Sequence, residues 1–265
     1  MSISPMLAGL VNAEPLLLRA QRRSNQNLER GKKLGVGPKL SIVTIAKTEN
    51  ELRPLIDAIE KQTYKNYEII FSTKGSIPEA WNDAISRATG DYLVFTESDA
   101  EPANNNWLLE ISMAVRPGTV IKGLEVKPTD LNLCNTVFDA SIFKVNKMMF
   151  DESFLICEDL ELFSRLRKRG IDIYRIPSFP VLHFSKETWK NTLRRAFIQG
   201  AYFVKILYLY GSKNTDEYGS RFPQIRKPQI GPVSNRIREI VHHLLVFCGL
   251  LVGALVYLPV KWQKR

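Results

Sequence analysis

From residue 40 onward, short apolar runs alternate with segments in which apolar residues recur at helical spacing. Three of the runs have the composition and length of buried strands, and they lie at 40–46, 67–72 and 92–95. Between them, helical spacing extends from Leu52 to Ile59 and from Ala80 to Ala88, where Gly90 ends the pattern. Strands alternating with helices predict an α/β fold, a Rossmann-like and mostly parallel sheet flanked by helices, with ligands bound at the carboxyl ends of the strands.

Two acidic clusters interrupt this apolar pattern. The first, Glu97-Ser98-Asp99, follows the third predicted strand directly, and the second is Glu158-Asp159. Carboxylates at the end of a buried strand lie where open α/β sheets bind ligands. The first cluster is suited to hold a metal and the second to accept a proton, although an ordinary solvated loop explains either cluster taken alone.

Composition bounds the class of protein. The 265 residues are 45% hydrophobic, which is enough for one domain of moderate size with an appendage. The three cysteines, Cys134, Cys157 and Cys248, form no CxxC pair, so the sequence indicates neither a zinc site nor a disulfide framework. A reducing, cytosolic setting fits best.

The charge is uneven. The chain carries a formal net charge of +10, and residues 184–238 contain eleven Lys or Arg against three acids. Such a stretch attracts an anionic partner. The adjoining run 244–260 has no charged residue, approaches the roughly 20 residues needed to cross a bilayer, and is followed by Trp262 and terminal cations that suit a membrane interface. We therefore expect a lipid surface, not nucleic acid, as the anionic partner.

Three segments outside the regular pattern complete the organisation. Residues 1–38 form a basic leader without a secretory signal, either amphipathic or mobile. Residues 186–238 form a basic amphipathic helical region, which either lies on the membrane or closes the core. Residues 239–265 form a transmembrane or membrane-embedded segment, for which a buried C-terminal helix or an in-plane anchor are the alternatives.

The order of several short motifs resembles the inverting nucleotide-sugar glycosyltransferases of family 2, which have the GT-A fold. The resemblance covers about residues 39–185, with a donor half at 39–103 and an acceptor half at 104–185. The motifs that carry it are Ser41–Glu49, Tyr67–Ile70, Gly75-Ser76, Ala80–Asn82, Ala88–Tyr92, the DXD-like Glu97-Ser98-Asp99, Asp151–Phe154, Glu158-Asp159, Arg165-Leu166, Gly170 and His183.

The resemblance implies roles for these residues. Asp99 is the expected metal ligand, Glu97 contacts the metal or the donor ribose, and His183 is either a third ligand or a structural hydrogen-bonding residue. A divalent cation, Mn²⁺ or Mg²⁺, neutralises the charge that develops on the leaving diphosphate. Asp159 is the expected general base, with Glu158 orienting the acceptor or tuning Asp159.

The donor is expected to contact further residues, namely Ala46, Thr48, Glu49, Lys74, Asn82 and Ser98, while Arg194 and Arg195 are candidates for a diphosphate contact. The sequence departs from the family at 71–75, where the aspartate that recognises the base is missing. The identity of the base therefore stays open, and Lys74 is either a phosphate contact or a solvated loop residue.

The sequence thus predicts a membrane-attached glycosyltransferase on the cytoplasmic face of the cell membrane. It would transfer a sugar, with inversion, from a nucleotide-diphosphate sugar to a lipid-linked or membrane-proximal glycan. The alternatives are a sugar-1-phosphate nucleotidyltransferase, which needs a glycine-rich loop that 46–50 lacks, and a non-catalytic membrane adaptor.

Overall fold

A computed structural model describes residues 37–125, 132–184, 189–211 and 233–257, so most of the predicted leader lies outside the described residues. These residues form two compact units, and each is described by itself. The first unit contains 37–75, 79–125, 132–148 and 172–184. The second contains 76–78, 149–171, 189–211 and 233–257, so part of the segment that the resemblance places in the acceptor half groups with the C-terminal helices.

The donor half of the sheet follows the predicted pattern. Strand β1 (Leu40–Ile45) lies between β2 (Tyr67–Ser72) and β3 (Tyr92–Phe95), and both pairings are parallel. Two helical connections make this parallel pairing possible, because each returns the chain to the same end of the sheet. The three strands predicted from the apolar runs are confirmed.

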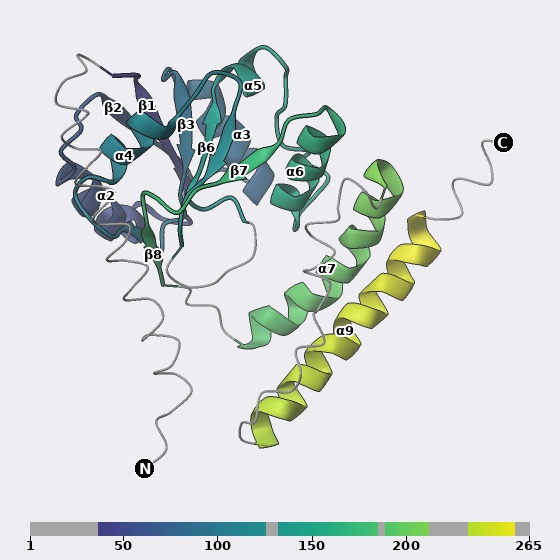
Figure 1. The fold of residues 1–265 in the computed structure, drawn as a ribbon. Helices are drawn as coiled ribbons and strands as arrows, with labels where there is room; N and C mark the ends of the chain where they lie inside the picture. Colours follow the sequence, from purple (N-terminus) through teal and green to yellow (C-terminus); the bar gives the residue numbers. More distant parts are fainter. Residues whose placement is uncertain (1–36, 126–131, 185–188, 212–232, 258–265) are drawn as a thin grey trace. The chain divides into compact units, whose positions relative to one another are not determined.

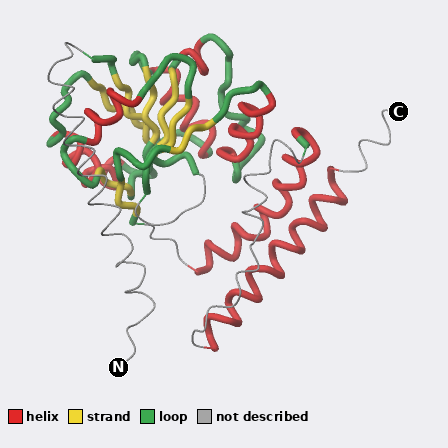
Figure 2. Tube along the Cα trace, viewed as in Figure 1, coloured by secondary structure: helices red, strands yellow, loops and turns green. Residues whose placement is uncertain are grey.

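Three further strands extend the sheet beyond β3 to give the order β2-β1-β3-β6-β5-β7 (Figures 1 and 2). Strand β6 (Thr136–Asp139) runs antiparallel to both of its neighbours, β3 and β5 (Val120–Lys122), and β7 (Ile173–Arg175) is parallel to β5. Only β6 therefore runs against the other strands of this sheet, and the predicted mostly parallel α/β architecture is confirmed.

The helices of the first unit pack on the sheet around aromatic side chains. Phe95 of β3 lies between Trp81 and Phe138, with ring centroids 5.3 and 5.1 Å away. Trp107 is fully buried and donates a hydrogen bond from its ring to Asn135. The helical elements are η1 (Glu49–Leu52), α2 (Arg53–Glu60), α3 (Ile77–Arg87), α4 (Trp107–Ala114) and α5 (Ser141–Lys144).

A second, two-stranded sheet lies beside the carboxyl ends of the main strands. It pairs β4 (Ala100–Pro102) antiparallel with β8 (Val181–His183), so that Ala100 lies opposite His183. The sequence pattern does not predict it, because three-residue strands are too short to show alternation.

The second unit consists of α6 (Glu158–Lys168), α7 (Trp189–Tyr210) and α9 (Val233–Tyr257). Helices α7 and α9 lie side by side (Figures 1 and 2) and approach closely at glycines. A Cβ on Gly249 would lie 1.9 Å from the carbonyl oxygen of Phe197, and one on Gly200 would lie 2.3 Å from that of Val246. Small residues thus let the two backbones come into direct contact, as in closely packed helix pairs.

The uncharged run that predicted a transmembrane segment lies in α9 as far as Tyr257, and the remaining residues 258–265 are outside the described part of the chain. Among the helices in the described ranges, none is long and apolar enough to span a bilayer. The predicted transmembrane crossing is therefore not supported.

Candidate functional site

The predicted donor residues gather at one edge of the main sheet. Ala46, Thr48 and Glu49 follow β1, Lys74 follows β2, and Glu97 to Asp99 follow β3. Because these three strands are parallel neighbours, their carboxyl ends meet at the same edge. Asn82 lies on α3, which connects β2 to β3.

The small sheet brings His183 to this edge. The Phe184 amide donates to the Asp99 carbonyl at 2.8 Å, and the Ala100 amide donates to the Glu97 carbonyl at 3.0 Å. These bonds hold the acidic turn against the end of β8. As a result, His183 Nε2 lies 3.1 Å from Glu97 Oε2 and 3.3 Å from Asp99 Oδ1.

The three side chains of this cluster differ in how far they are exposed to solvent. The imidazole of His183 is 7% exposed, whereas the side chains of Glu97 and Asp99 are 38% and 31% exposed. The ring therefore lies at the base of the cluster and the carboxylates border solvent. One atom from each of the three residues lies within 4.8 Å of the others. Two carboxylate oxygens and one imidazole nitrogen form a donor set that fits Mn²⁺ or Mg²⁺.

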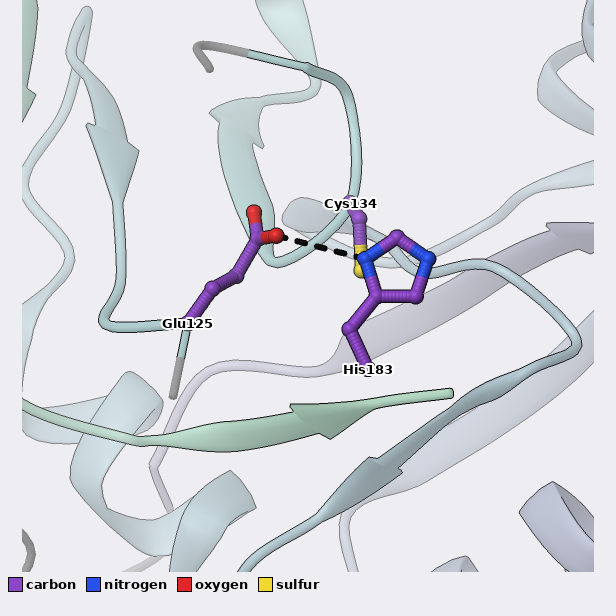
Figure 3. Close-up of side chains that lie close together, drawn as sticks. All are labelled: Glu125, Cys134 and His183. Carbon is purple, nitrogen blue, oxygen red and sulfur yellow. Dashed lines mark hydrogen bonds and ion pairs between the residues drawn. The ribbon is translucent and has the colours of Figure 1, made fainter. Parts of the chain in front are cut away.

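The other ring nitrogen of His183 faces a different carboxylate. Nδ1 lies 3.3 Å from Glu125 Oε2 (Figure 3), and the Glu125 side chain is 5% exposed. Glu125 also forms a buried ion pair with Lys122, whose ammonium group bonds the carbonyl of Cys134 as well. His183 is thus contacted by carboxylates at both ring nitrogens.

Cys134 lies beside Glu125 and His183 and makes a second grouping that could hold a metal (Figure 3). Burial raises the pKa of the Cys134 thiol well above its ordinary value, and the charges of Glu97 and Glu125 raise it further. A thiol is a poor ligand until it loses its proton. Because Lys122 already neutralises Glu125, the grouping of Glu97, Asp99 and His183 is the better candidate to hold a metal.

The surrounding carboxylates set the protonation of the ring. Hydrogen bonds to Asp99, then Glu125 and Glu97, raise the pKa of His183 to about 11. The ring is therefore an imidazolium cation in the metal-free protein at neutral pH. A divalent cation bound at Nε2 would replace the proton there, so metal binding would release a proton.

The loop after β2 contains a second charged cluster. The ammonium group of Lys74 and the guanidinium group of Arg87 both bond Asp83 on α3. The bond from Lys74, with those from Ser72 and Arg87, lowers the pKa of Asp83 to about 2 despite opposing desolvation. The predicted phosphate contact Lys74 is thus held by α3, with its side chain 73% exposed at the edge where the donor is expected.

The predicted general base lies in the second unit. Glu158 and Asp159 are the first two residues of α6, and both are half-buried. Two 2.9 Å bonds join Arg165 and Glu161 within this helix, and the Tyr210 hydroxyl of α7 donates a further bond to Glu161. Arg194 and Arg195 have exposed side chains on α7.

Glu125 and Lys122 were not predicted from the sequence. Lys122 is the last residue of the short strand β5, Glu125 follows that strand, and no motif marks either residue. Their spacing of three residues suits a local ion pair, which is the only signal that the sequence carries. Their proximity to His183, which is 58 residues from Glu125, depends on the tertiary fold.

Neither a protein-family model nor a curated protein sequence matches the chain. Solved structures do match. The mannosyltransferase PcManGT from Pyrobaculum calidifontis, in complex with GDP-Man and Mn²⁺, matches with a TM-score of 0.58 and 12% identity over 98% of both chains. S. aureus TarS in complex with UDP-GlcNAc has a TM-score of 0.48 and 11% identity over 80% of this chain and 81% of its own. At this identity the first match shows that the two chains share a fold and no more.

Proposed function

We propose that the protein is a metal-dependent glycosyltransferase that uses a nucleoside-diphosphate sugar. The observation that carries this proposal is the cluster of Glu97, Asp99 and His183 at the carboxyl edge of β1 to β3. A site for a hard cation at this edge suits a substrate with a diphosphate group. The complex of the structural neighbour with GDP-Man and Mn²⁺ agrees with this assignment.

The proposed reaction is a single displacement with inversion, as in the family 2 enzymes that the sequence resembles. A hydroxyl oxygen of the acceptor bonds to the anomeric carbon, the bond from that carbon to the diphosphate oxygen breaks, and the hydroxyl proton passes to the Asp159 carboxylate. Glu158 orients the acceptor. Glu97, Asp99 and His183 hold the cation, which when bound neutralises the charge that develops on the leaving nucleoside diphosphate.

The proposed acceptor is a lipid-linked or membrane-proximal glycan, met at the cytoplasmic face of a membrane. Its support is an apolar face on α9 that α7 does not cover. Leu244, Phe247, Leu251 and Leu255 are each more than half exposed, with Leu255 at 76%. They recur at helical spacing, as in helices that lie in a membrane interface.

A ligand-protection experiment tests the proposal. Nucleotide sugars are screened for a rise in Tm with and without Mn²⁺ or Mg²⁺, because a ligand that binds the folded state stabilises it. We expect protection by at least one nucleoside-diphosphate sugar that requires the metal. Asp99→Asn should abolish that protection, whereas Glu101→Gln, a change on the adjoining strand β4, should retain it.

Two outcomes would refute the proposal. Protection that does not depend on a metal would remove the role of the cluster. Protection without any hydrolysis or transfer of the sugar, over the acceptors tested, would identify a nucleotide-sugar-binding adaptor and not an enzyme.

A further inference from the structure

The Lys122–Glu125 ion pair lies on the side of His183 that faces away from Glu97 and Asp99. The ring has carboxylates at both nitrogens, but only Nε2 faces the half-exposed metal cluster. Nδ1 faces the buried Glu125 at 3.3 Å (Figure 3). The two nitrogens therefore have different environments and are suited to different tasks.

The backbone fixes Glu125 in this position. Glu125 forms an isolated parallel bridge with Val181, the first residue of β8. The Val181 amide donates to the Leu124 carbonyl at 3.0 Å, and the Leu124 amide donates to the Ser178 carbonyl at 3.1 Å. Glu125 and His183 thus belong to segments that are hydrogen-bonded side by side, which limits how far either side chain can move.

Lys122 determines which charge Glu125 presents to the ring. Its ammonium group bonds one carboxylate oxygen of Glu125, and the Asn132 side chain accepts a further bond from it at 2.7 Å. Both partners of the ion pair have side chains that are 5% exposed. A buried carboxylate persists only when it is paired, so Lys122 keeps Glu125 ionised beside the ring. The second oxygen of Glu125 remains directed at Nδ1.

We propose that the Lys122–Glu125 pair is a positioning device for the metal site. The Glu125 carboxylate accepts a hydrogen bond from Nδ1–H, which fixes the ring orientation and leaves the Nε2 lone pair free to bind a cation held by Glu97 and Asp99. Carboxylates that bond the outer nitrogen of a metal-bound histidine act in this way in many metal sites. The inference rests on the proposed metal site and adds to it two residues that touch neither the cation nor the substrate.

Direct measurement of Mn²⁺ binding, without donor or acceptor, tests the inference. The change is Glu125→Gln, which keeps the size of the side chain but removes its charge, and the readout is free Mn²⁺ by electron paramagnetic resonance. We expect the Mn²⁺ affinity to fall by about 10- to 100-fold, the usual effect of losing such a partner. Glu68→Gln is the matched control, because Glu68 also pairs with a lysine in the first unit but contacts Lys39 and Ser41, away from the cluster.

The buried Lys122 left by Glu125→Gln can weaken the fold, so a second variant is needed. Lys122→Met/Glu125→Gln removes both charges and leaves no unpaired ammonium group. It should show the same loss of Mn²⁺ affinity with a Tm closer to that of the wild type. Wild-type affinity in this folded double variant would overturn the inference.

A mutant cycle with His183→Ala shows whether Glu125 acts through the ring. If it does, Glu125→Gln adds little to the loss already caused by His183→Ala, because the two effects are coupled. Equal losses in both backgrounds would overturn the inference. If Asp99→Asn and His183→Ala leave Mn²⁺ affinity unchanged, the proposed metal site itself fails, a result distinct from failure of Glu125 alone.

Discussion

The carboxyl edge of the sheet and the outer face of α9 are both exposed, but they are built in opposite ways. The edge brings together Glu97, Asp99 and His183 from two separate segments, and each side chain depends on β4 pairing with β8. The face of α9 comes from one continuous helix, and its members Leu244, Phe247, Leu251 and Leu255 share a side through helical spacing alone.

This difference has a physical consequence. A polar site of three ligands fails when one segment moves by about 1 Å, because coordination requires defined distances. An apolar face tolerates the loss of one member, since burial of apolar area is non-directional and roughly additive. Single substitutions should therefore have large effects at the sheet edge and graded effects on α9.

The largest expected effect is at Asp99. Asp99→Asn keeps the size of the side chain but removes the charge that binds the cation, so metal-dependent transfer should be abolished. Because the carboxylate is 31% exposed, the free energy of unfolding should change by less than about 1 kcal/mol. Transfer assays and denaturant titrations measure the two quantities, and near-normal turnover would contradict the assignment.

A smaller effect is expected at Asp159. Asp159→Asn cannot accept a proton, so transfer should fall by about 10²- to 10⁴-fold while donor binding persists. Glu158→Gln provides the neighbouring control and should reduce transfer less. Isothermal titration with the donor and a transfer assay separate the two properties. Loss of donor affinity in Asp159→Asn would make this residue a donor ligand and not the base.

On α9, a graded effect is expected. Leu251→Glu/Leu255→Glu places charge on the exposed face, and co-sedimentation with anionic vesicles should fall more than tenfold, because an apolar side chain contributes about 1.5–3 kcal/mol when buried. Val145→Glu is the control, since Val145 is also exposed but lies in the first unit.

Vesicle binding of the unchanged chain should persist at high salt, which screens charge but not apolar burial. Equal binding by both variants would exclude α9 as the lipid-contacting face.

The smallest expected effect concerns stability and pH. Desolvation opposes ionisation of Glu68, but bonds from Ser41, Lys39 and Thr89 lower the pKa of Glu68 to about 2 from an ordinary 4.5. A depressed pKa stabilises the folded state above pH 4.5, and this contribution is lost as the pH falls through 2. Glu68→Gln should therefore lower the free energy of unfolding by about 1–2 kcal/mol at pH 7. Urea titrations should show the difference from the wild type shrinking between pH 4.5 and 2, and a constant difference would contradict this origin.

Part of the candidate site follows from the sequence because it depends on local pattern. The apolar runs predict β1, β2 and β3, and the parallel arrangement places Glu97 and Asp99 at their carboxyl edge. His183 was a candidate ligand only through the family resemblance, and the pattern around it does not predict β8. Among the helices that the structure describes, none is long and apolar enough to span a bilayer, so the transmembrane prediction from 244–260 is not supported.

The α/β class, the first three strands with their helices and the carboxylates at the sheet edge follow from the amino-acid pattern alone, because periods of two and 3.6 residues are local properties. Long-range packing, in contrast, places His183 against Glu97 and Asp99, places Glu125 and Lys122 behind the ring, and brings α7 and α9 together at glycines. These contacts join segments far apart in the chain. They are fixed by strand pairing and close packing, which local pattern does not encode.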